Sequence, residues 1–94
     1  MVAKSDILEA KQEIEDKLKE RFDKACEKVF VFETDWGHLR ALIGSDAFRD
    51  APLGERQEIV WQFLRDSVPN EHWTHLIAVH PMDIDEYDRN TREV

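Results

Sequence analysis

Hydrophobic residues follow two different spacings along this chain, and the wider spacing predicts two long helices. In residues 5–28 the apolar positions step by seven, four, four and three, which keeps them on a single helix face. This first stripe consists of Ile7, Ile14, Leu18, Phe22 and Ala25. A second helix is predicted from Pro52, which is well tolerated in a first turn, to the residue before Pro69. Its stripe consists of Leu53, Val60, Phe63, Leu64 and Val68. Polar neighbours such as Arg56 are expected on the surface.

Three shorter apolar runs predict strands. Residues 29–32 are β-branched or aromatic, and residues 38–43 alternate so that one face is the more apolar. The turn-like residues between these runs include Gly37, so the two strands should form an antiparallel hairpin. The third run, residues 73–81, has four consecutive apolar residues at its centre. Such a run favours burial on both faces, which predicts the central strand of the sheet.

The remaining segments complete an α+β order. Residues 46–50 predict a single helical turn with Phe48 turned inward, and residues 83–89 predict a short helix with Asp83 as its cap and Tyr87 packing back. The order is therefore αββ(α)αβα. A right-handed helical crossover returns the third strand to the hairpin, which predicts a three-stranded mixed sheet with helices packed on one face. The 94 residues are expected to form a single domain, 1–94, with its core at about 5–88.

Composition and charge narrow the classes of function. The net charge of −8 disfavours binding to a nucleic-acid backbone, which depends on Lys and Arg displacing counterions. No apolar run approaches the roughly 18 residues of a membrane span. Cys26 is the single cysteine and has no CxxC partner, so a small buried or half-buried residue is expected there. A lone cysteine, together with a first segment that lacks the apolar core of a signal peptide, indicates a cytoplasmic protein.

The sequence carries no catalytic motif. GxSxG, HExxH, P-loop and Rossmann patterns are all missing, and no carboxylate falls in an apolar context, so no enzyme is predicted. His75 and His80 are five residues apart and should point to opposite faces of a regular strand, where they cannot share a metal. A histidine at the position of His75 is more often a hydrogen-bonded strand-end residue than a ligand. Residues 49–55 hold one glycine, so they lack the GxxG loop with which KH domains clamp nucleic acid.

Order and spacing over about residues 29–87 resemble the BolA family. That family pattern has a histidine where its second strand begins, a Ser-x-x-Phe element, a helix with a basic residue and an aliphatic-aromatic pair, a strand that begins with histidine, and a closing turn. The corresponding segments here are Gly37-His38-Leu39-Arg40, Ser45-Asp46-Ala47-Phe48, Leu53-Gly54-Glu55-Arg56, Ile59-Val60-Trp61, His75-Leu76-Ile77-Ala78-Val79 and Asp83-Ile84-Asp85-Glu86-Tyr87. The last segment lacks the family's usual Thr-Pro and Trp. The resemblance implies a BolA-like αββααβ(α) fold, similar to a class II KH domain without its GxxG loop.

The same resemblance implies a function and a site. BolA-like proteins pair with monothiol glutaredoxins, and the pair can share a [2Fe–2S] cluster in iron–sulfur trafficking or iron and redox regulation. His75 corresponds by position to the family's histidine ligand. The second family ligand lies in the loop between the first two strands, where Asp35 occupies the place of a frequent cysteine and His38 is near. The implied protein is a non-enzymatic adaptor without a cofactor of its own. The alternatives are a nucleic-acid-binding regulator of KH-like fold, which the charge disfavours, and a plain protein-interaction domain with structural histidines.

Overall fold

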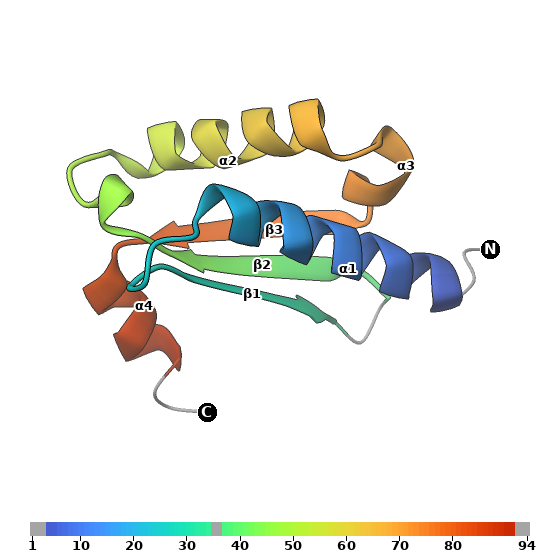
Figure 1. The fold of residues 1–94 in the computed structure, drawn as a ribbon, viewed down its shortest axis with the longest axis horizontal. Helices are drawn as coiled ribbons and strands as arrows, with labels where there is room; N and C mark the ends of the chain where they lie inside the picture. The colour runs from blue at the N-terminus through green and yellow to red at the C-terminus, as the bar shows by residue number, and fades with distance from the viewer. Residues whose placement is uncertain (1–3, 35–36, 92–94) are drawn as a thin grey trace.

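The computed structural model describes residues 4–34 and 37–91, which form a three-stranded sheet and its helices (Figure 1). The elements in chain order are α1 (Lys4–Arg21), β1 (Lys28–Glu33), β2 (Leu39–Gly44), the 3-10 helix η1 (Asp46–Phe48), α2 (Leu53–Ser67), α3 (Asn70–Trp73), β3 (Leu76–Met82) and α4 (Ile84–Thr91). Helices α1 and α2 run roughly along the direction of the strands, whereas α4 lies at the end where β2 and β3 stop (Figure 1). The α+β class is therefore confirmed.

The sheet has the order β1-β2-β3 and is mixed, as predicted. Strands β1 and β2 form the expected antiparallel hairpin, and β2 pairs in parallel with β3. The prediction that the third run is the central strand is wrong, because β2 lies in the middle and β3 at an edge. Along β3 the register shifts between Leu76 and Ala78, which leaves Ile77 as an extra residue, 47% exposed. The apolar composition of β3 alone did not reveal that this strand has a neighbouring strand on only one side.

The core lies between the sheet and the two long helices. Alternate residues of β2 face it, and Leu39, Ala41 and Ile43 are fully buried. The helices and the other strands add further fully buried apolar side chains, namely Ala10, Ile14, Leu18, Val31, Val60 and Leu64. Phe48 is 1% exposed and packs on Phe22, with ring centroids 5.5 Å apart, so the predicted inward turn is confirmed.

The first helix is shorter than predicted. It ends at Arg21 and not near residue 28, so Ala25 and Cys26 are exposed, against the expectation for both. A local turn replaces the helix, because the backbone N–H of Glu27 donates to the Lys24 carbonyl at 2.9 Å and the Glu27 carboxylate accepts from the Lys24 N–H at 3.1 Å. That carboxylate also accepts the hydroxyl of the fully buried Ser45. These side-chain bonds compete with the helical ladder and end it early.

Helix α4 corrects the expectation that all helices pack on one face. A Cβ on Gly44 would lie only 2.8 Å from Cβ and Cγ of Tyr87, so this helix touches β2 at a glycine. Because Gly44 alternates with Ile43 along β2, α4 packs against the face opposite the core. The predicted Asp83 cap is confirmed: Asp83 Oδ1 accepts the Glu86 N–H at 2.8 Å, and Glu86 Oε1 accepts the Asp83 N–H at 2.9 Å.

The second helix and the segment after it depart from the pattern at three residues. Leu53, placed in the apolar stripe, is 62% exposed in the first turn of α2. Arg56, expected on the surface, keeps only 12% of its side chain exposed. Trp73 belongs to the short helix α3, which the hydrophobic pattern did not predict, and meets the ring of Trp61 at 6.1 Å edge to face. The third strand therefore begins at Leu76, three residues later than predicted.

Candidate functional site

Backbone hydrogen bonds bring His38 and His75 to the same end of the sheet. The carbonyl of His75 accepts the N–H of Leu39 at 2.9 Å, and His38 directly precedes Leu39. The carbonyl of His38 accepts the Thr34 N–H at 2.7 Å and closes the loop between β1 and β2. That loop and the turn before β3 therefore meet. Asp35, the third predicted site residue, lies outside the described residues.

Both imidazoles at this end are accessible. His38 is exposed and His75 is half-buried. Within residues 4–34 and 37–91, neither imidazole takes part in a hydrogen bond or an ion pair. The described part of the chain also contains no group of three or more His, Cys, Asp or Glu side chains that could hold a metal by itself. Among the described residues, this end of the sheet therefore offers the imidazoles of His38 and His75 as possible metal ligands.

The cysteine lies away from these histidines. Cys26 is two residues before β1, and Lys28 pairs with Gly44 at the end of the sheet opposite His38 and His75. The carboxylate of the next residue, Glu27, is bonded to Ser45 at that same far end. Because Cys26 is the only cysteine of the chain, no thiolate of this molecule joins the two imidazoles.

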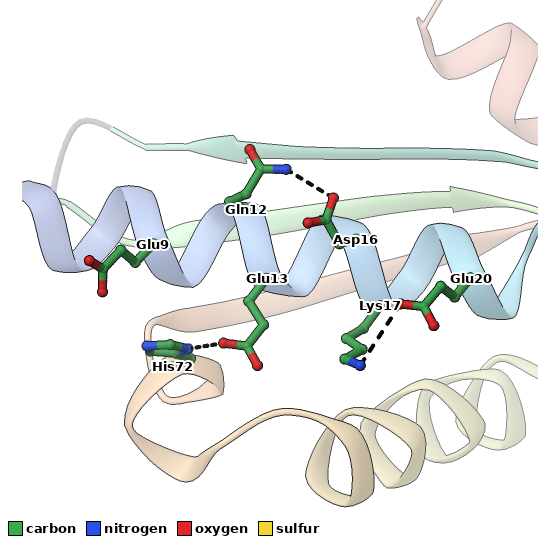
Figure 2. A pocket seen from close by; sticks show the side chains of 7 residues that line it. All are labelled: Glu9, Gln12, Glu13, Asp16, Lys17, Glu20 and His72. Atoms are coloured by element: carbon green, nitrogen blue, oxygen red, sulfur yellow. Dashed lines mark hydrogen bonds and ion pairs between the residues drawn. The ribbon is translucent and has the colours of Figure 1, made fainter.

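His72 has a structural partner on the first helix. Its Nδ1 lies 2.5 Å from Glu13 Oε2, which joins α3 to α1 (Figure 2). The pair borders a groove of about 450 Å³. The other side chains along this groove are Glu9, Gln12, Asp16, Lys17 and Glu20. Of the two histidines in His72-x-x-His75, His72 is therefore engaged with Glu13, whereas the His75 imidazole has no such partner among the described residues.

His80 lies at the other end of β3. It pairs with Leu42 on the face away from the core and is half-buried. Burial, and next the positive charge of Arg40, hold its pKa below the ordinary value of 6.5. The parity argument that separated His75 from His80 assumed one regular strand, which is wrong because His75 precedes β3 and the bulge at Ile77 interrupts the alternation. The two histidines are separated instead by the length of the strand.

A small cavity beside His80 was not predicted. It measures about 240 Å³ and is lined by Leu42, His80, Met82 and Asn90. Met82 was missed because the predicted strand stops at Pro81, whereas β3 continues through the proline to Met82. Asn90 was missed because the predicted last helix stops at residue 89, whereas α4 continues to Thr91. The spacing His80-x-Met82 is the signal that would have placed the side chains of His80 and Met82 on one face of a strand.

These features define a small α+β domain with a three-stranded, mixed, open sheet and, in the described residues, four α-helices. Comparisons with protein-family models, with curated proteins and with solved structures found no match for this chain. Among the helices that the structure describes, none combines the length and the apolar character needed to cross a membrane.

Proposed function

We propose that this chain is a BolA-like, non-enzymatic adaptor that pairs with a monothiol glutaredoxin in iron–sulfur cluster trafficking or in iron and redox regulation. The observation that carries this function is the hydrogen bond from the Leu39 N–H to the His75 carbonyl. Through it the histidine before β3 meets the loop between β1 and β2, the two segments from which BolA-like proteins draw cluster ligands. The helix and strand order along the chain is also compatible with that family.

The residues at this end fit part of a [2Fe–2S] ligand set. Imidazole replaces thiolate on one iron of some [2Fe–2S] centres, so His75 and His38 are suitable donors. Cys26 is at the opposite end of the sheet, and the thiolates must therefore come from the glutaredoxin and its thiol cofactor. The shared cluster supplies the transferable or redox-active iron. This chain holds it through imidazole nitrogen, which binds a metal only in the neutral form.

Two local features prepare this end for a partner protein. His75 is held on both sides of its backbone, because its N–H donates to the His72 carbonyl at 3.2 Å and its carbonyl accepts from Leu39. Because these bonds fix the backbone of His75, only its side-chain torsions remain to be ordered when a partner binds. Two residues after His75, the bulged Ile77 exposes 47% of its surface. An exposed apolar side chain therefore lies close in sequence to the candidate ligand. Burial of this exposed apolar side chain by a partner would add to the stability of the complex.

A titration with a cluster-loaded monothiol glutaredoxin tests this function. We expect a one-to-one complex and a changed visible absorption and circular dichroism spectrum of the cluster. His75→Ala should abolish the spectral change and keep the far-ultraviolet spectrum of the fold. His80→Ala is the matched control, because it makes the same chemical change at the other end of β3, and it should behave as wild type.

Three outcomes contradict the proposal in different ways. If no complex forms, the adaptor function is wrong. If a complex forms but the cluster spectrum is unchanged, or if His75→Ala and His80→Ala behave alike, the histidine is not a ligand, and the chain is a plain interaction domain. If a single-stranded nucleic-acid probe is shifted in a salt-dependent manner while the glutaredoxin is not bound, the regulator of KH-like fold is favoured.

A further inference from the structure

The cavity beside His80 brings together two metal-binding side chains that the proposed function does not use. Beyond the bulge, alternate residues of β3 point away from the core, so His80 and Met82 stand on one face. Both line the cavity of about 240 Å³, with Leu42 of β2 and Asn90 of α4 as the other walls. The cavity lies near the Gly44–Met82 pair, at the end of the sheet opposite His38 and His75.

The chemistry of the lining selects a soft metal ion. An imidazole nitrogen and a thioether sulfur are ligands that Cu(I) accepts, whereas Mg²⁺, Ca²⁺ and Mn²⁺ require oxygen ligands. Among the described residues, no carboxylate lines the cavity. Asn90 offers only a neutral amide oxygen, since its Nδ2 donates to the Glu86 carbonyl at 2.7 Å, and Leu42 is apolar. A hard divalent cation therefore finds no charged oxygen among the described lining residues.

We propose that this cavity binds Cu(I) through the imidazole of His80 and the thioether sulfur of Met82. Residues i and i+2 of a strand are ~6.6 Å apart along the chain, so two long side chains on one face can reach the same ion from either side. Leu42 shields the ion from water on the β2 side. The positive charge of Arg40 acts on His80. The repulsion between this guanidinium and an ion bound to His80 would be twice as large for a divalent ion as for a monovalent one.

Anaerobic titration with Cu(I) in the presence of a coloured Cu(I) chelator tests the site on the purified full chain. We expect one Cu(I) per chain in competition with the chelator. Met82→Leu keeps the volume and apolar character of the side chain but removes the sulfur, and should weaken Cu(I) binding at least tenfold. His80→Gln should weaken it similarly. His75→Gln is the matched control at the other end of the sheet and should leave Cu(I) affinity unchanged.

A second measurement needs no variant. Ag(I) is an air-stable substitute for Cu(I), and the chain has only two methionines, so their methyl NMR signals are easily assigned. We expect Ag(I) to shift the Met82 methyl and the His80 ring signals and to leave Met1 unmoved. The inference is overturned if wild-type chain takes no Cu(I) from the chelator, if Met82→Leu binds Cu(I) as well as wild type, or if Ag(I) moves only Met1. Since His75 and His80 lie at opposite ends of the sheet, failure of this site leaves the glutaredoxin titration unaffected.

Discussion

Arg56 joins three parts of the chain at the end of the sheet that carries α4. Its Nε donates to the Ala51 carbonyl at 2.7 Å, just before α2. Its Nη1 donates to the Pro81 carbonyl of β3 at 3.4 Å and to Glu86 Oε1 of α4 at 2.9 Å. Only 12% of the side chain is exposed. Replacing Arg56 by alanine therefore tests whether this guanidinium fixes the second helix to the C-terminal part of the fold.

The cost of Arg56→Ala can be worked from its partners. A hydrogen bond from a charged donor contributes about 1.5–3 kcal/mol, and the 2.7 Å bond to Ala51 has the better geometry of the two carbonyl contacts. The ion pair with Glu86, whose side chain is 36% exposed, adds less than about 1 kcal/mol. In the variant, water replaces part of the hydrogen bonds and of the ion pair, and alanine loses less side-chain entropy on folding than arginine does. We expect the free energy of unfolding to fall by about 2 kcal/mol, which lowers the Tm by roughly 10 °C in a chain of this size.

Urea unfolding followed by tryptophan fluorescence and far-ultraviolet circular dichroism measures this loss. Arg65→Ala is the matched control, because it removes the same side chain from an exposed position of α2 and should change stability by less than about 0.5 kcal/mol. Equal destabilisation by the two substitutions would refute the reasoning. So would a double-mutant cycle in which Arg56 and Glu86 couple by much more than about 1 kcal/mol, since the ion pair would then outweigh the carbonyl bonds.

Four further predictions concern packing and pH. Gly44→Ala should lower the free energy of unfolding by about 1–3 kcal/mol, because its Cβ would lie 2.8 Å from Tyr87, whereas Gly54→Ala, with nothing within 4 Å, should raise it by roughly 0.5 kcal/mol; urea midpoints compare the pair. Phe48→Ala should lower it by about 3–5 kcal/mol, since the ring is 1% exposed; a loss below 1 kcal/mol would contradict its place in the core. Because the pKa of His80 is lowered in the fold, the unfolded chain takes up the proton first as the pH falls. The contribution of His80 to stability is therefore full above pH 6.5 and is lost below it. His80→Gln should make the urea midpoint depend less on pH between about 7.5 and 5.5 than it does in the wild type. The pKa of Glu86 is lowered by the Asp83 N–H and then by Arg56, so its contribution is full above pH 4.5 and lost below; Glu86→Gln should reduce the acid sensitivity in that window, and an unchanged acid midpoint would contradict it.

Local patterns in the sequence were sufficient for much of the fold. Hydrophobic periodicity located both long helices and the hairpin, and residue chemistry found the Asp83 cap and the inward Phe48. These features depend on residues close in sequence. The early end of α1 was missed because the carboxylate that ends it, on Glu27, is held by Ser45, eighteen residues away. Arg56 was misplaced for the same reason, since Pro81 and Glu86 are distant in sequence.

The candidate site shows the same division between local and distant information. His75 was selected by its position in a family-like pattern, and its proximity to His38 depends on the parallel pairing of β2 with β3, which the predicted helical crossover implied. The cavity beside His80 was not anticipated. It requires α4 to cross to the second face of the sheet, and the contact that allows this is a glycine, whose missing side chain leaves no hydrophobic signal.

The third strand was chosen as the centre of the sheet on its apolar content, and its two irregular residues explain why it is an edge. Proline has no backbone N–H and cannot donate a ladder hydrogen bond, so Pro81 within β3 is tolerated because one side of this strand is unpaired. The extra residue at Ile77 bends the strand where it begins and turns an apolar side chain outward. Apart from the extra residue Ile77, β3 keeps its pairing with β2 from Leu76 to Met82. His75 precedes the bulge, and His80 lies between the bulge and the proline. The two residues that mark β3 as an edge strand thus stand next to the two histidines, Ile77 two positions after His75 and Pro81 directly after His80.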